Sequence, residues 1–182
     1  MLFDPVTICL KDGRTAILRP PMADDAAEMI ACMRDTAGET DFLLGYPEER
    51  NISVEKEAAF LASMADDPNA LMIMCEVDGH LAGNCHLAFN TKIKKRHRAD
   101  VAIALRKTYW GLGIGSAMFD MMIHTAKSRP GVQLLELEFI EGNSRARALY
   151  EKYGFRIAAL HPDAIMLKDG TLLNEYLMQK RL

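Results

Sequence analysis

The sequence lacks the spacings that mark a zinc site or a disulfide framework. Its four cysteines, Cys9, Cys32, Cys75 and Cys85, are scattered, with no C-x-x-C pair and no paired histidines near them. Structural zinc sites and disulfide-rich folds depend on such closely spaced ligands. We therefore expect free, buried thiols and no metal centre.

Long apolar runs and an excess of positive charge are also absent. The net charge is −3, whereas a nucleic-acid-binding domain is usually basic, with a pI above about 9. No apolar run approaches the roughly 18 residues of a membrane-spanning helix, and Asp4, Lys11 and Asp12 interrupt the start where a signal peptide would be apolar. We therefore expect a cytoplasmic protein that binds neither nucleic acid nor a membrane.

Size and composition indicate one globular domain over residues 1–182. The chain is 49% hydrophobic and 26% charged, as is ordinary for a soluble domain. A chain of this length buries a substantial core without disulfides or metals.

Turn signals and periodicity predict an α+β fold, a mixed α/β layered sheet with helices on both faces. Asp-Gly pairs at residues 12–13, 78–79 and 169–170 separate alternating runs and predict hairpins. Residues 38–51 are expected to form a loop or a broken helix. Strands are expected at 6–10, 15–19, 71–77, 80–89, 99–105 and 134–140 and as two closing strands from 155; helices are expected from Asp24, from near Ser53, and over 113–128 and 143–153.

Residues 109–116, Tyr-Trp-Gly-Leu-Gly-Ile-Gly-Ser, lie between an apolar run and an amphipathic helical pattern. Glycines there leave backbone N–H groups bare at a helix N-terminus, where the helix dipole favours an anion such as a phosphate. The dinucleotide motif G-x-G-x-x-G fails, because Ser116 or Met118 stands where its third glycine would be. A P-loop fails as well, because no Gly-Lys-Ser/Thr follows. A dinucleotide-binding oxidoreductase is therefore not indicated.

A second segment, residues 143–155, reads Asn-Ser-Arg-Ala-Arg-Ala-Leu-Tyr-Glu-Lys-Tyr-Gly-Phe. Together the two segments resemble the GNAT superfamily of acetyl-CoA-dependent N-acetyltransferases, whose patterns are Q/R-x-x-G-x-G/A and N-x-x-A-x-x-L-Y-x-K-x-G-F. The second pattern is matched throughout. The first is matched at Gly113 and Gly115, but Trp110 stands where Arg or Gln is usual. Residues 17–20 and the segment from Asp169 to Met178 also resemble the first strand and the last hairpin of the family.

The resemblance implies the GNAT acyl-CoA N-acyltransferase fold, in which two parallel neighbouring strands, here those ending at Leu105 and Ile140, splay apart and hold the cofactor. It implies acetyl-CoA as co-substrate. Backbone N–H groups of the glycine loop would bind the pyrophosphate, and the strand edge before it would pair with the pantetheine amides. Asn143 would add an amide contact, or serve only as a helix cap. The expected cofactor-binding residues are Ile103, Ala104, Leu105, Gly111, Leu112, Gly113, Ile114, Gly115, Ser116, Asn143 and Tyr150.

Acetyl transfer to an amine needs a proton donor for the departing thiolate and an acceptor for the amine proton. Tyr150 is the expected donor, because a phenol with a pKa of about 10 is protonated at pH 7. Tyr153 is assigned to packing. Asp100, on the strand before the glycines, is the expected catalytic base. Glu136, Glu138 and His86 remain alternatives to Asp100.

Two basic segments are candidate sites for a negatively charged ligand. Residues 92–98 form a charge run at an expected hairpin tip, where such runs are usually solvated. Arg106 and Lys107 precede the loop and are candidates for the 3′-phosphate of the cofactor. The stripe of Met118, Phe119, Met121 and Met122 is assigned to the core side of its helix.

The sequence therefore predicts an enzyme that transfers an acetyl group from acetyl-CoA to a primary amine, by direct attack in a ternary complex. The acceptor is a small molecule or a peptide, and a homodimer is possible. The alternative function is an acyl-CoA-binding domain that acts as a sensor or partner without turnover. The sequence does not identify the amine.

Overall fold

The computed structural model describes residues 1–182 and contains one eight-stranded sheet, in the order β1-β2-β3-β4-β5-β6-β8-β7. The strands are β1 (Val6–Cys9), β2 (Thr15–Arg19), β3 (Ala70–Val77), β4 (His80–Phe89), β5 (Arg98–Leu105), β6 (Leu134–Ile140), β7 (Arg156–Met166) and β8 (Leu172–Arg181). The α-helices are α1 (Ala26–Gly38), α2 (Val54–Asp66), α3 (Ile114–Ser128) and α4 (Ser144–Lys152). Three short 3-10 helices cover Ala23–Asp25, Pro47–Glu49 and Lys107–Tyr109. This element order confirms the predicted α+β architecture.

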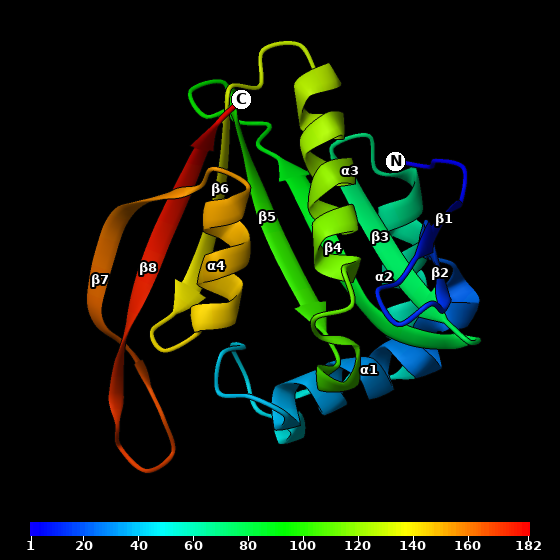
Figure 1. Cartoon of the computed structure of the whole chain (residues 1–182), viewed down its shortest axis with the longest axis horizontal. Coiled ribbons are helices and arrows are strands. Elements are labelled where there is room, and N and C mark those ends of the chain that lie inside the picture. The colour runs from blue at the N-terminus through cyan, green and yellow to red at the C-terminus, as the bar shows by residue number, and fades with distance from the viewer.

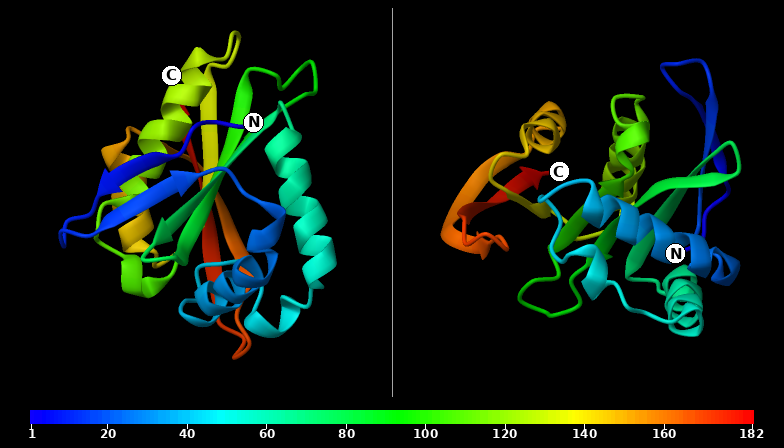
Figure 2. Two further views of the ribbon diagram at one scale, coloured as in Figure 1. Left: turned by 90° about the vertical axis from the view of Figure 1, so that its right-hand side faces the viewer. Right: turned by 90° about the horizontal axis from the view of Figure 1, so that it is seen from below.

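Helices cover both faces of the sheet, as Figures 1 and 2 show, with α1 and α2 on one face and α3 and α4 on the other. The larger core lies beneath α3 and α4, and Met118, Phe119 and Met122 are all fully buried in it. A smaller cluster, which includes Met29 and Leu61, packs α1 and α2 against β3 and β4. The predicted apolar stripe of α3 is therefore core at these three positions, whereas Met121 is only partly buried against it.

The centre of the sheet opens into a wedge between β5 and β6. These parallel strands pair only from Arg98 to Asp100, opposite Leu134 to Glu136. Beyond that point β5 stays paired with β4 and β6 with β8, so the two strands separate toward their C-terminal ends (Figure 1). The β5 edge from Val101 to Leu105 consequently has no strand beside it, which confirms the expected splayed parallel pair.

The predicted hairpins join β1 to β2, β3 to β4 and β7 to β8. In the middle one, Asp78 and Gly79 both adopt positive φ, 52° and 78°, the conformation that a two-residue type I′ turn requires. Such turns are encoded locally, which explains why the sequence predicted them.

The cysteines are all free, as expected, and three of them are buried. The expectation of burial was wrong for Cys9, which is exposed at the end of the edge strand β1.

No helix combines the length and apolar composition that a membrane crossing would need.

Candidate active site

The glycine loop forms a cradle at the start of α3, with a geometry that suits an anion. Gly111 and Gly113 have φ of 80° and 101°, and Gly113 is the N-cap of the helix. The left-handed backbone strains any residue with a Cβ, so glycine is required for conformation. The backbone N–H groups from Gly111 to Ser116 donate to no other group of the protein. An anion at this helix terminus would receive several hydrogen bonds and the favourable end of the dipole.

One cavity of about 560 Å³ joins this cradle to the wedge. It is bounded by the loop, by the unpaired end of β5, by the end of β6 and by α4. Of the expected cofactor-binding residues, every one except Leu112 lines it: Ile103, Ala104, Leu105, Gly111, Gly113, Ile114, Gly115, Ser116, Asn143 and Tyr150. The side chain of Leu112 packs against the core, and its carbonyl accepts a hydrogen bond from the Lys11 N–H at 3.1 Å.

Gly115 has a packing role that the sequence did not reveal. A Cβ at this position would lie 3.0 Å from Cδ2 of Leu149. The absence of a side chain therefore lets α3 approach α4 closely, beside the cavity.

Asn143 is the N-cap of α4, and its Oδ1 accepts a hydrogen bond from the Ala146 N–H at 3.1 Å. The cap interpretation is confirmed. Its side-chain NH₂ group donates to nothing in the protein, and the residue also lines the cavity. The second role, a contact to the cofactor, stays a prediction.

Tyr150 lines the cavity from a largely buried position. The side chain is 7% exposed and packs against Phe119 and Phe139, with ring centroids 5.6 and 6.2 Å apart. Its hydroxyl makes no hydrogen bond within the protein. Burial raises the pKa of Tyr150 to about 12, because the phenolate would lose its hydration. The phenol is therefore protonated at physiological pH, the state in which it can donate a proton.

Tyr153 fastens α4 to the first turn of α3. Its hydroxyl donates to the Ser116 carbonyl at 2.7 Å and its ring stacks on Phe119, while Lys152 donates to the Ser116 hydroxyl at 2.9 Å. Tyr153 does not line the cavity, which agrees with the packing role assigned from the sequence.

The four candidate bases are placed very differently. Asp100 lies outside the main cavity, in a neighbouring one of about 370 Å³, and desolvation together with the nearby Glu136 raises its pKa. Glu138 lines both cavities, and desolvation together with Glu175 raises its pKa. Glu136 is engaged by the Arg98 guanidinium and by Gln179. His86 lines neither cavity.

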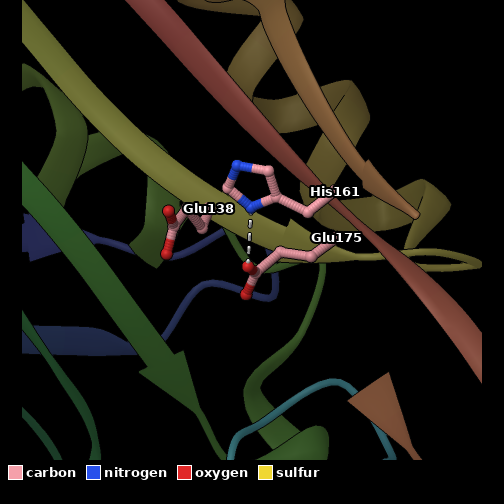
Figure 3. Close-up of side chains that lie close together, drawn as sticks. All are labelled: Glu138, His161 and Glu175. Carbon is pink, nitrogen blue, oxygen red and sulfur yellow. Dashed lines mark hydrogen bonds and ion pairs between the residues drawn. The ribbon is translucent and has the colours of Figure 1, made fainter. Parts of the chain in front are cut away.

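Glu138, Glu175 and His161 converge from β6, β8 and β7 (Figure 3). Nδ1 of His161 lies 3.3 Å from Oε2 of Glu175, and the ligand atoms of the three residues lie within 4.8 Å of one another. Such a group attracts a cation, either an ammonium or a metal ion. The expectation of no metal centre stays a prediction.

The sequence and the fold are similar to those of known proteins. Residues 37–155 match the model of the Acetyltransferase (GNAT) family, which is most of the chain. The chain belongs to this family. A GNAT acetyltransferase structure from Streptococcus pneumoniae superposes with a TM-score of 0.85 at 27% identity, covering 92% of this chain and 99% of that one.

Other GNAT proteins share the fold at lower identity. A ribosomal-protein-alanine N-acetyltransferase structure from Brucella melitensis gives a TM-score of 0.77 at 22% identity, covering 91% of this chain and 99% of that one. The Salmonella typhimurium yncA structure, which contains acetyl-CoA, gives 0.76 at 17% identity and covers 91% and 92%. A Bacillus subtilis protein, provisionally named a ribosomal protein bS18 alanine N-acetyltransferase, is 29% identical over 98 residues. That match covers 54% of this chain and 62% of the relative, so the chain spans less than two thirds of it.

In this GNAT chain the cations beside the glycine loop are not those expected. Arg106 is engaged by Asp35, with Nε 3.0 Å from Oδ2, and donates to the Leu81 carbonyl; it does not line the cavity. Lys107 is exposed and outside the cavity as well. The cavity is lined instead by Lys11, from the β1–β2 turn, and Arg145, from α4. Arg106 is therefore not free to bind the 3′-phosphate, because it is paired with carboxylates of α1 that are far from it in the sequence.

The loop between α1 and α2 also contributes residues that the sequence analysis missed. Phe42, Leu44 and Arg50 line the cavity, and the loop lies below the open ends of β5 and β6 (Figure 1). Lys168 of the β7–β8 turn holds the loop in place, because its N–H donates to the Tyr46 hydroxyl at 3.0 Å and its ammonium lies 4.1 Å from the Tyr46 ring centroid. No local motif signals these contacts, because they join segments far apart in the sequence.

Proposed function

We propose that this protein is an N-acetyltransferase that moves an acetyl group from acetyl-CoA to a primary amine, by direct attack in a ternary complex. One observation carries the proposal. A single cavity is lined by the glycine loop with its unbonded N–H groups, by the unpaired edge of β5 and by Tyr150, whose hydroxyl has no partner in the protein. These are the groups needed to bind a phosphate-bearing acyl donor, to align its amide arm and to protonate a leaving group.

Acetyl-CoA supplies an acetyl group already activated as a thioester. The loop from Gly111 to Ser116 binds its diphosphate, and the edge of β5 from Ile103 to Leu105 accepts its amide arm as an added strand. Asn143 contributes its free NH₂ group. As the carbon–nitrogen bond forms and the carbon–sulfur bond breaks, Tyr150 donates its proton to the departing sulfur.

The proton lost by the amine goes to a carboxylate. Glu138 is favoured over Asp100, because Glu138 shares the cavity with Tyr150 whereas Asp100 lies in the adjoining one. Asp100 remains a candidate that acts through water, since the two cavities share Val101 and Glu138. Raised pKa values bring both carboxyl groups nearer to the pH at which a general base works best.

The acceptor is an amine that enters as an ammonium. Glu138 and Glu175 place negative charge on the wall of the cavity, and no lysine or arginine pairs with either of them. A small-molecule amine and a peptide amine both fit this description, and the names of the relatives suggest peptides that begin with alanine for the test. Cytoplasmic location, a single domain over residues 1–182, the absence of nucleic-acid and membrane partners, and a possible homodimer stay predictions.

The test measures thiol release from acetyl-CoA with a panel of amines, amino acids, polyamines and peptides beginning with alanine, alongside calorimetric titration with acetyl-CoA. We expect binding of acetyl-CoA, acetylated product with at least one acceptor, and no added acetyl mass on the protein without acceptor. Tight binding of acetyl-CoA without turnover on any acceptor would favour the sensor function. Binding of NADH or ATP but not acetyl-CoA would overturn the proposal.

A further inference from the structure

Trp110 places an aromatic ring at the entrance of the glycine loop. Its Nε1–H donates to the Leu105 carbonyl at 2.7 Å, so the indole has no donor left for a phosphate. The hydrogen bond fixes the ring against the end of β5. Whatever a side chain at this position contributes to the loop must therefore come through the face of the ring.

The face of this ring carries the guanidinium of Arg145. Cζ of Arg145 lies 5.2 Å from the Trp110 ring centroid, within the range of a cation–π interaction. One of its Nη atoms lies 3.8 Å from the point that a Cβ on Gly111 would occupy. Trp110 thus holds a positive charge beside the first of the bare N–H groups.

The Arg145 charge has no carboxylate partner. Two other arginines near the site are paired: Arg106 contacts Asp35, and Arg147, two residues further along α4, contacts Glu151 at 2.8 Å. Arg50 also lines the cavity without a carboxylate partner, but its guanidinium donates to the Leu44 carbonyl of its own loop. Arg145 lines the cavity and forms no ion pair. An unpaired guanidinium beside a row of unbonded N–H groups is suited to a phosphate, which accepts two parallel hydrogen bonds from it.

We propose that Arg145, held on the ring of Trp110, binds the diphosphate of acetyl-CoA together with the glycine loop. The inference rests on the proposed function, since it assumes acetyl-CoA as the ligand. Trp110 is a positioning residue in this arrangement.

The experiment is calorimetric titration of the full chain with CoA and with 3′-dephospho-CoA, which keeps the diphosphate. Arg145→Ala should weaken both ligands by the same factor, about tenfold, because the lost hydrogen bonds are charge-assisted but exposed. Trp110→Leu should weaken both ligands in the same direction, and Trp110→Phe less so, since Phe keeps a ring face. Arg147→Ala is the matched control, and it should bind as wild type does.

Fluorescence provides a readout that does not depend on turnover. Trp110 is the only tryptophan, so CoA binding should change the emission of the wild type, and Arg145→Ala should reduce the change. Thermal melts should show that Arg145→Ala is folded, as expected for an exposed side chain.

Each contrary outcome has a distinct meaning. If the wild type binds neither ligand, the proposed function fails. If the wild type binds both and Arg145→Ala stays within twofold of it, or Arg147→Ala weakens binding as much, only this inference is overturned. A loss confined to CoA would place Arg145 on the 3′-phosphate and overturn the diphosphate assignment.

Discussion

Replacing Tyr150 with phenylalanine removes one oxygen atom from the proposed active site and leaves its surroundings intact. The ring stays packed against Phe119 and Phe139, and no hydrogen bond within the protein is lost, because the hydroxyl makes none. We therefore expect the free energy of unfolding to change by less than about 0.5 kcal/mol. The affinity for acetyl-CoA should be nearly unchanged as well, because the loop and the β5 edge hold it.

The effect on catalysis should be much larger. General acids contribute on the order of a hundredfold to rate, which corresponds to about 2.7 kcal/mol of transition-state stabilisation. Because the pKa of Tyr150 is about 12, the donor stays protonated throughout the usual assay range. The loss in Tyr150→Phe should consequently be constant with pH. Single-turnover thiol release, with an acceptor found by the amine panel, measures the chemical step directly.

Tyr153→Phe is the matched control on the same helix. It removes a hydroxyl that donates to the Ser116 carbonyl at 2.7 Å, so it should lower the free energy of unfolding by about 1 kcal/mol and leave the single-turnover rate within about threefold. The two variants should thus show opposite patterns of stability and rate. An unchanged single-turnover rate in Tyr150→Phe, or an equal loss in Tyr153→Phe, would refute the assignment.

Gly113→Ala, at a φ of 101° with open space around the new Cβ, should cost about 1–2 kcal/mol of stability and raise the Kd for acetyl-CoA at least about tenfold. Gly131→Ala, with similar φ and space but outside the cavity, should cost similar stability without that loss of affinity, as titration and thermal melts would show. Because a base must be deprotonated, kcat/KM should rise with pH through the raised pKa of Glu138, and Glu138→Gln should remove this rise. A pH profile altered only by Asp100→Asn would instead make Asp100 the base. Glu57 is 3% exposed, one of its carboxylate oxygens has no partner, and burial raises its pKa. The protonated form is therefore more favourable in the folded than in the unfolded chain, so the stabilising contribution of this group is fully present below the ordinary Glu pKa and is lost as pH rises through the raised value. Glu57→Gln should raise Tm at about pH 8 and lose that advantage near pH 4; an equal Tm at the higher pH would contradict this.

The sequence predicted features that are encoded by neighbouring residues. Three such features form where expected: the glycine loop at Gly113, the cap at Asn143 and the turn at Asp78–Gly79. Backbone conformation and capping depend on residues within one turn. The partners of Arg106 could not be predicted in this way. Its ion pair with Asp35 joins segments 71 positions apart, and no local pattern distinguishes it from a free cation before the loop.

The amino-acid sequence by itself determined the element order, the hairpins and the family, because periodicity, turn residues and two motifs are properties of local chain chemistry. Only the tertiary structure decided which charged groups face the cavity. Asp100 and Glu138 lie on adjacent strands, yet the separation of β5 and β6 beyond Asp100 puts Glu138 on the wall of the cavity that Tyr150 also lines, and Asp100 in the neighbouring cavity. Arg145 meets Trp110 for the same reason, since α4 follows β6 across the wedge while the loop follows β5. Long-range strand pairing sets these distances, and it depends on the whole sheet.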